Sequence, residues 1–148
     1  MKRELTLLTA LLFLCLLSCT KQEKTEPEKT FFSDAQTKAL KVINGSFSYT
    51  IADLTTTITF LEQYNPPKTG ILDNGTEIPV HGKYRIVYYA GQTFERYFFL
   101  SNAGDKFYSF IDLTNIISIE TKDFRIVDDN TFQWKTTKDV LWDTYIRK

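Results

Sequence analysis

The sequence predicts a small all-β domain, an antiparallel up-and-down meander of about eight strands that closes into a barrel and follows one short N-terminal helix. From Ser46 onward, short runs of β-branched and aromatic residues recur roughly every ten residues, and Gly, Pro, Asn and Asp mark the turns between them. No helical stretch between these runs is long enough for the crossovers that parallel strands require. Such a sheet tends to close because closure removes exposed edges. A β-sandwich is the alternative architecture.

Length and composition indicate one folded domain. The chain has 148 residues, of which 43% are hydrophobic and 15% aromatic, and its 18 basic residues balance its 18 acidic ones. This hydrophobic content excludes a disordered chain, and the lack of a basic surplus argues against a nucleic-acid-binding protein. We therefore expect no nucleic acid among its partners.

Residues 1–18 are typical of a signal peptide. Lys2 and Arg3 form a basic start, and an apolar run follows from Leu5 to Leu17. As a helix this run reaches only about 20 Å, whereas the hydrocarbon core of a bilayer is about 30 Å thick. The run is therefore too short to be a membrane span.

Leu16-Leu17-Ser18-Cys19 resembles the lipobox of bacterial lipoproteins, with a branched apolar residue three positions before the cysteine and a small residue directly before it. The resemblance implies that Cys19 carries acyl chains and becomes the mature N-terminus. The other cysteine, Cys15, follows the bulky Phe13 and Leu14, which do not resemble a cleavage site. A secretory peptide without lipidation is the alternative. The domain itself has no thiol for disulfides, catalysis or metal ligation.

Residues 19–30 comprise the predicted lipidated cysteine and a flexible tether, and residues 31–148 form the domain. The tether contains no large apolar residue and one proline, as a solvated linker does. Removing Lys2, Arg3 and Glu4 leaves 16 basic and 17 acidic residues, so a mature charge of −1 does not attract an anionic membrane. Acyl chains on Cys19 would supply the anchor. In the lipoproteins it resembles, a residue other than Asp after the cysteine, here Thr20, is compatible with the outer membrane of a Gram-negative bacterium. The periplasmic and surface faces both remain open.

One helix is predicted between Ser33 and Gly45. Ser33 and Gln36 form a capping box, Asp34 places a negative charge at the N-terminal end of the helix dipole, and Asn44-Gly45 supplies a left-handed stop. The apolar residues between them fall near one face, so this face is expected to pack on the sheet.

Eight or nine strands are predicted from β-rich runs that are bounded by turn residues. The runs are Ser46–Ala52, Thr55–Tyr64, Glu77–Val80, Lys83–Ala90, Thr93–Ser101, Lys106–Leu113, Asn115–Thr121, Phe124–Val127, Thr131–Thr136 and Val140–Arg147. Asp73-Asn74-Gly75-Thr76 is the strongest hairpin turn. Asn65-Pro66-Pro67 is expected to end a strand, because proline has no amide proton for a ladder. Pro79 and Gly82 predict a bulge or an edge.

A single lipid-anchored domain, with a short helix that ends in Gly, then successive hairpins and a final aromatic strand, resembles the small lipocalin-like lipoproteins of Gram-negative bacteria. The resemblance covers Ser33 to Lys148. Lipocalins open their barrel with Gly-x-Trp, whose ring is covered by a basic residue from a late strand. Here Gly45-Ser46-Phe47 stands in that place, with Arg147 as the possible cover. The resemblance implies the barrel fold and says almost nothing about a ligand.

Few residues are suited to catalysis or metal binding. His81 is the only histidine, no Gly-x-Ser-x-Gly elbow accompanies it, and we expect a surface or strand-end position for it. Asp128-Asp129-Asn130 lacks the spacing of a calcium loop and is typical of a turn. A carboxylate pair for glycoside hydrolysis remains an alternative, with Glu62, Glu95 and Glu120 as the candidates within strands. We expect no catalytic residue, metal or cofactor.

Large aromatic residues occupy adjacent positions in three consecutive strands, where a strand buried on one face would alternate. They are expected on both faces of the sheet. One face fills the core, and the other lies under the helix, forms a binding patch or lines a ligand cavity. Tyr88, Tyr97 and Tyr108 are the candidate binding residues, because a phenol tolerates water and stacks on sugars or apolar ligands.

These observations favour a non-enzymatic, membrane-anchored envelope lipoprotein. The expected partner is a small hydrophobic or glycan-like ligand or an envelope protein. A structural subunit or inhibitor that docks on an envelope protein is the alternative, and a carboxylate-based hydrolase is a further one.

Overall fold

The computed structural model describes residues 30–148. The predicted signal peptide, Cys19 and the tether up to residue 29 lie outside the described residues. Within residues 30–148, no helix combines the length and the hydropathy needed to cross a bilayer.

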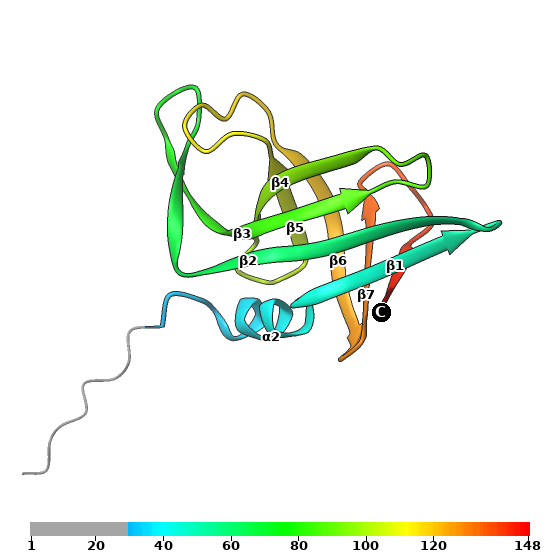
Figure 1. The fold of residues 1–148 in the computed structure, drawn as a ribbon. Helices are drawn as coiled ribbons and strands as arrows, with labels where there is room; N and C mark the ends of the chain where they lie inside the picture. The colour runs from blue at the N-terminus through cyan, green and yellow to red at the C-terminus, as the bar shows by residue number, and fades with distance from the viewer. Residues whose placement is uncertain (1–29) are drawn as a thin grey trace, which may run out of the picture.

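Antiparallel strands form a closed barrel in which each strand pairs with the next in sequence and the last pairs with the first (Figure 1). The predicted meander and barrel are confirmed, and the sandwich is excluded. The strands are β1 (Gly45–Ile51), β2 (Leu54–Ile71), β3 (Glu77–Val87), β4 (Thr93–Leu100), β5 (Lys106–Phe110), β6 (Glu120–Asp128), β7 (Thr131–Thr136) and β8 (Asp143–Arg147).

Two predicted interruptions differ from the structure. Pro79 and Gly82 do not divide β3, which runs from Glu77 to Val87 as one strand. The predicted strand Asn115–Thr121 is also wrong for most of its length, because residues 111–119 form a loop. Its last two residues belong to β6, which continues without a break through the predicted strand Phe124–Val127. The extra residues that disturb the pairing of β2 with β3 lie in β2 and not at Pro79 or Gly82 of β3.

β2 passes through Asn65-Pro66-Pro67, so the prediction that these residues end the strand is wrong. Gln63 pairs with Gly82 and Lys68 pairs with Val80, which leaves residues 64–67 opposite His81 alone. Cross-strand pairing is interrupted over these four residues, so the missing proline amide protons cost no ladder hydrogen bond. The strand bends here and then resumes pairing.

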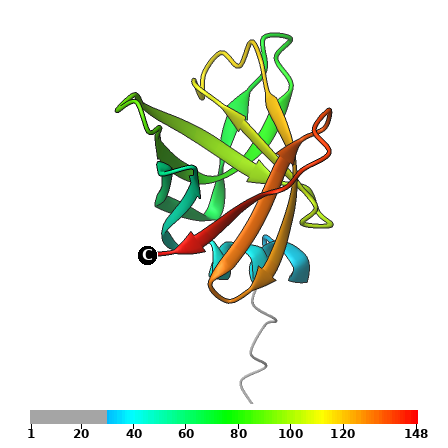
Figure 2. The same cartoon turned by 90° about the vertical axis from the view of Figure 1, so that its right-hand side faces the viewer.

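Residues 64–80, which we call the hairpin extension, turn back toward the loop at residues 111–119. The amide of Ile71 donates to the Leu113 carbonyl at 2.9 Å, and the amide of Ile116 donates to the Ile71 carbonyl at 2.8 Å. Figures 1 and 2 both show the tip of this hairpin beside that loop. The tip is the predicted Asp73-Asn74-Gly75-Thr76 turn, with Gly75 at φ +82°.

Helix α2 (Asp34–Val42) closes one end of the barrel. Its predicted capping box is confirmed: Ser33 Oγ accepts from the Gln36 amide and Gln36 Oε1 accepts from the Ser33 amide. The Gln36 side chain then donates to the Leu100 carbonyl at 3.0 Å, which fixes the helix against the end of β4. Ala39, Leu40 and Ile43 enter the barrel core.

Aromatic rings fill the interior of the barrel. Each is buried and packs edge-to-face, tilted or stacked against others from neighbouring strands; they are Phe47, Phe60, Tyr84, Phe98, Phe107, Phe124, Phe132, Trp134 and Tyr145. An eight-stranded barrel has an interior about wide enough for side chains alone, and large rings suit that space.

Arg147 ties the last strand to the first strand and to the helix. Its guanidinium lies 4.8 Å from the centre of the Phe47 ring and donates to the carbonyls of Asn44 (2.5 Å) and Val42 (2.7 Å). Gly45 adopts φ +117°, and a Cβ there would lie 2.9 Å from Arg147 Nη1. Glycine is therefore required both by the backbone and by the close approach of the arginine. The predicted cover of Phe47 by Arg147 is confirmed.

Replacing Arg147 with Ala should lower the free energy of unfolding by about 2 kcal/mol, because two helix-terminal carbonyls lose a charged donor. Arg147→Lys keeps the charge but loses the planar fork, so it should restore less than half of that loss. Urea unfolding followed by tryptophan fluorescence measures both values. Arg85→Ala on the exposed outer surface is the control and should cost well under 1 kcal/mol. Equal losses for Arg147→Ala and Arg85→Ala would contradict the role assigned to Arg147.

Candidate functional site

The end of the barrel opposite α2 is called the open end. In an up-and-down barrel alternate turns lie at the same end, and here the open end carries the connections at residues 52–53, 88–92, 111–119 and 137–142. Figure 1 shows the first two of these connections on the side away from α2. The connection at residues 101–105 lies at the closed end, where the Ser33 hydroxyl donates to the Asn102 carbonyl at 2.7 Å.

Three charged side chains, from Arg96, Glu120 and Lys122, face the inside of the barrel near the open end. Directly paired residues of adjacent strands share a face. Arg96 pairs with the buried Tyr84, and Lys122 pairs with the buried Phe107. Glu120 pairs with Ser109, which itself pairs with the buried Phe98. We call Arg96, Glu120 and Lys122 the inner charged cluster.

Within the inner charged cluster, Glu120 is held between two cations at unequal distances. Lys122 Nζ lies 2.6 Å from Glu120 Oε1, whereas Arg96 Nη1 lies 3.5 Å from Glu120 Oε2. The Lys122 ammonium also lies 5.3 Å from the centre of the Trp134 ring. The side chains of Lys122, Arg96 and Glu120 are 16%, 28% and 41% exposed, so water and small solutes reach them.

The hydroxyl of Ser109 lies beneath this cluster without a hydrogen-bond partner. The residue is 1% exposed, and its Oγ is the one buried side-chain polar atom of residues 30–148 that lacks such a partner. The phenol of Tyr84 interacts with it, but too loosely to satisfy hydrogen-bond geometry. Burial raises the pKa of Tyr84 to about 12, so the phenol keeps its proton at neutral pH.

Two further tyrosines face the same interior, near Asp143 at the start of β8. Tyr49 and Tyr145 lie with ring centres 5.4 Å apart, and Asp143 pairs with the buried Trp134. Burial, followed by the Asp143 carboxylate, raises the pKa of both phenols. The open end therefore presents protonated phenols beside fixed charges of both signs.

The structure separates the three predicted binding tyrosines. Tyr88 lies at the open end, and its ring packs edge-to-face against that of Phe94, which shares the inner face with Ile86. Tyr97 and Tyr108 lie on the outer face of β4 and β5, where Tyr97 stacks on Phe110 and Tyr108 on Phe99. Tyr88 therefore belongs to the open end, apart from Tyr97 and Tyr108. Their role in binding remains a prediction.

The outer aromatic face lies under the hairpin extension, a cover that the sequence analysis did not anticipate. Tyr64 and Val80 of the extension form a second buried cluster with Phe110 and Ile116, against which Tyr97 and Phe99 pack. The helix, which was one expected cover, closes the end of the barrel instead. Adjacent aromatic residues in β4 and β5 thus serve two packed layers, one inside the barrel and one outside.

The three glutamates considered for a carboxylate pair do not converge. Glu120 faces inward, whereas Glu95 lies on the outer face between Lys83 (2.5 Å) and Arg85 (2.6 Å). We call Lys83, Arg85 and Glu95 the outer charged cluster. Glu62 pairs with Lys83 in the ladder and therefore also lies outside the barrel.

His81 is buried, not at the surface as expected. Its Nδ1 accepts a hydrogen bond from the Leu100 amide at 3.1 Å, and its ring packs edge-to-face on Phe32 at 5.1 Å. The residue is buried because residues 64–67 curve around it where the pairing of β2 and β3 is interrupted. Burial lowers its pKa to about 4, which keeps the imidazole neutral. The side chain has the contacts of a packing residue.

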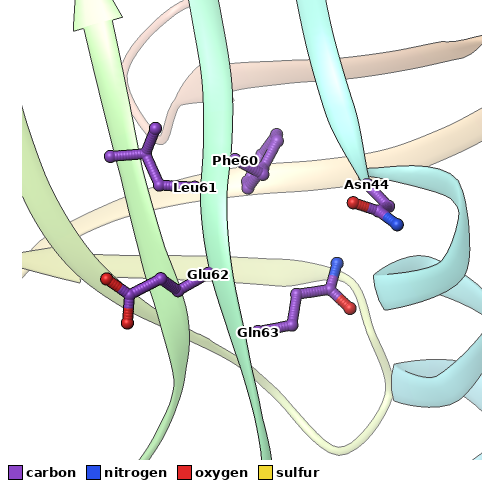
Figure 3. A pocket seen from close by; sticks show the side chains of 5 residues that line it. All are labelled: Asn44, Phe60, Leu61, Glu62 and Gln63. Atoms are coloured by element: carbon purple, nitrogen blue, oxygen red, sulfur yellow. The ribbon is translucent and has the colours of Figure 1, made fainter.

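One surface hollow beside the helix and the other acidic side chains offer fewer groups for binding or catalysis. This hollow of about 240 Å³ lies beside the end of α2, and Figure 3 shows Asn44 and Gln63 on one side of β2 and Glu62 on the other. The Gln63 amide is already engaged with the Leu40 carbonyl at 2.7 Å. In the part of the chain that the structure describes, no three His, Cys, Asp or Glu side chains are grouped as metal ligands.

His81 should make the fold less stable in mild acid. Its pKa is about 6.5 when unfolded and about 4 in the fold, so the unfolded chain binds more protons between these values. The stabilisation is complete above pH 6.5 and is lost as the pH falls to 4, by up to about 3 kcal/mol. The difference between wild type and His81→Gln, which retains an acceptor without titrating, isolates this contribution in urea unfolding at pH 7 and pH 4.5. An imidazole pKa above 6 in an NMR titration of the folded protein would refute it.

Comparisons with models of protein families, with curated proteins and with solved structures found no match. The barrel and its open end therefore carry the functional inference, together with the sequence features at the N-terminus.

Proposed function

We propose that this protein is a lipid-anchored binding module of the cell envelope that takes a small glycan-like ligand at the open end of its barrel. The observation that carries the proposal is the inner charged cluster, which lies within reach of solvent and next to the rings of Trp134 and Tyr84. A binding site typically combines apolar and aromatic walls with a few polar groups that fix orientation.

The chemistry of the open end suits a sugar better than a wholly apolar ligand. Sugar rings have apolar C–H faces that stack on aromatic side chains and hydroxyls that both donate and accept hydrogen bonds. Glu120 supplies an acceptor, Lys122 and Arg96 supply donors, and Tyr88 supplies a half-exposed ring. An apolar ligand would instead leave these charges desolvated and poorly paired, which is unfavourable.

The proposed anchor is an acylated Cys19, followed by the tether to Thr30. The described chain joins the barrel at its closed end, through Ser33 and α2. A tether of about 11 residues spans at most roughly 40 Å. Anchoring from this side leaves the open end free to meet a ligand.

A second candidate function is docking on an envelope protein, and exposed apolar residues favour it. Val140 and Leu141 are 87% and 81% exposed in the β7–β8 connection. Ile111 and Ile117 are also exposed, and they line a hollow of about 430 Å³ in the β5–β6 loop. Exposed apolar groups of this kind are common where a protein meets a partner.

Glu120→Gln should weaken binding of a neutral glycan identified on an array by about tenfold, because a charged acceptor for its hydroxyls is lost. Glu95→Gln is a matched control: Glu95 also lies between a lysine and an arginine, but on the outer face. It should leave the affinity unchanged. Calorimetry on the mature protein measures both variants. Equal effects of the two substitutions would contradict a site at the open end, and capture of an envelope protein that is lost on Leu141→Ser would favour docking.

Cys19→Ser should move the protein from the membrane fraction to the soluble fraction and remove acyl chains from its N-terminal peptide. The reason is that the charge of the mature chain offers no other attraction to the membrane. Cell fractionation and mass spectrometry of that peptide report the result. Cys15→Ser, within the predicted signal peptide, is the control and should keep the lipid. A membrane-bound, acylated Cys19→Ser protein would contradict the assignment.

A further inference from the structure

We infer that the ligand of the open end carries a carboxylate, which the guanidinium of Arg96 binds. This inference rests on the proposed function and names the chemical class of its ligand. Three features of the inner face carry it: an arginine with unused donors, a buried hydroxyl without a partner, and the local balance of charge.

Arg96 has more hydrogen-bonding capacity than its neighbours use. Its one ion contact is with Glu120 at 3.5 Å, and it makes no side-chain hydrogen bond within residues 30–148. Glu120 is held more closely by Lys122, at 2.6 Å. A guanidinium offers five donors in a planar fork that matches the two oxygens of a carboxylate. With 28% of its side chain exposed, Arg96 can receive such a group from solvent.

The outer charged cluster contains the same three residue types, and there the arginine donates hydrogen bonds to the glutamate. Arg85 donates to Glu95 Oε1 through both Nε (3.1 Å) and Nη2 (2.6 Å), and Lys83 binds the other carboxylate oxygen at 2.5 Å. The inner cluster has the same composition of one glutamate, one lysine and one arginine. It differs in that Arg96 lies 3.5 Å from Glu120 and donates no hydrogen bond to it. The unused donors of Arg96 therefore result from the geometry of the inner face and not from the residue types.

Ser109 provides an independent indication of a ligand oxygen. Its hydroxyl is almost fully buried, has no hydrogen-bond partner, and shares the inner face with its direct strand partner Glu120. A buried, unpaired polar group is unfavourable, so its presence calls for an explanation, and a ligand oxygen is one. The phenol of Tyr84, which pairs with Arg96 in the ladder, supplies a second loosely engaged donor beside it.

The charges that face this part of the barrel favour one added anion. Arg96 and Lys122 are positive and Glu120 is negative, so the inner charged cluster has a net charge of +1. Asp143 also faces the interior and is negative, but it lies beside Tyr49 and Tyr145 and forms no ion pair with Arg96 or Lys122 among the described residues. A single carboxylate would neutralise the cluster and occupy the donors of Arg96. Acidic sugars such as uronates combine that group with the hydroxyls and the ring face expected of a glycan.

The test compares matched neutral and acidic sugars on the mature protein. The probes are oligomers of galactose and galacturonate, and of mannose and mannuronate, which differ only in the oxidation of C6. We expect at least a tenfold tighter dissociation constant for the uronate of one pair in isothermal titration calorimetry. Arg96→Gln should abolish this preference, because it should weaken binding of the uronate at least tenfold more than binding of the matched neutral sugar. The control Arg85→Gln, on the outer face, should keep the preference. If Arg96→Gln fails to fold, Arg96→Lys serves instead, and loss of the bidentate fork should reduce the preference at least threefold.

The outcomes separate this inference from the proposed function. Equal binding of neutral and acidic members overturns the carboxylate and leaves the glycan site standing. A preference that survives Arg96→Gln, or Arg96→Lys where that variant is used, overturns the assignment to Arg96. Failure to bind any member of either pair or of a wider glycan array overturns the proposed function and the inference together.

Discussion

The pairing of β1 with β8, which Arg147 reinforces, closes the barrel, and closure is the constraint on which the other features depend. β1 and β8 share only two directly paired positions, Phe47 with Arg147 and Ser48 with Ile146. Arg147 adds side-chain bonds to the end of α2 and covers the Phe47 ring. A short seam is thereby joined to the helix that seals the same end. Once the sheet is closed at this seam, every strand has an inner and an outer face, and the two ends of the barrel become different.

Closure gives chemically similar residues different roles. Glu95 and Glu120 each lie between a lysine and an arginine, but only Glu120 faces the barrel interior. Arg85 and Glu95 are direct ladder partners on the adjacent strands β3 and β4. Arg96 and Glu120 lie on β4 and β6, with β5 between them. This wider spacing explains why the outer pair makes two hydrogen bonds while Arg96 stays 3.5 Å from Glu120.

Features specified by local sequence were predictable, and those that depend on strand curvature were not. The capping box of Ser33 and Gln36, the turn at Asp73-Asn74-Gly75-Thr76 and the cover of Phe47 by Arg147 follow from short signals or from one motif. The bend at residues 64–67 could not be predicted in this way. Prolines end a strand only where their backbone nitrogen would have to donate a hydrogen bond to the neighbouring strand. The fold-back of the hairpin extension, and with it the cover of Tyr97, depends on that bend. The inner charged cluster was missed because the inward-facing and outward-facing positions of β6 can be assigned only when the strand is known to begin at Glu120.

The depth at which polar groups lie explains why the inner charged cluster is at the open end and not in the barrel centre. Fully buried charges would lose their hydration among the packed rings, so charged side chains occur on the inner face only where solvent still reaches them. Ser109 lies one step deeper, where its hydroxyl is cut off from water without gaining a protein partner. That arrangement is unfavourable in the free protein. Under the proposed function, a ligand oxygen that reached this hydroxyl would supply the acceptor and recover that cost on binding.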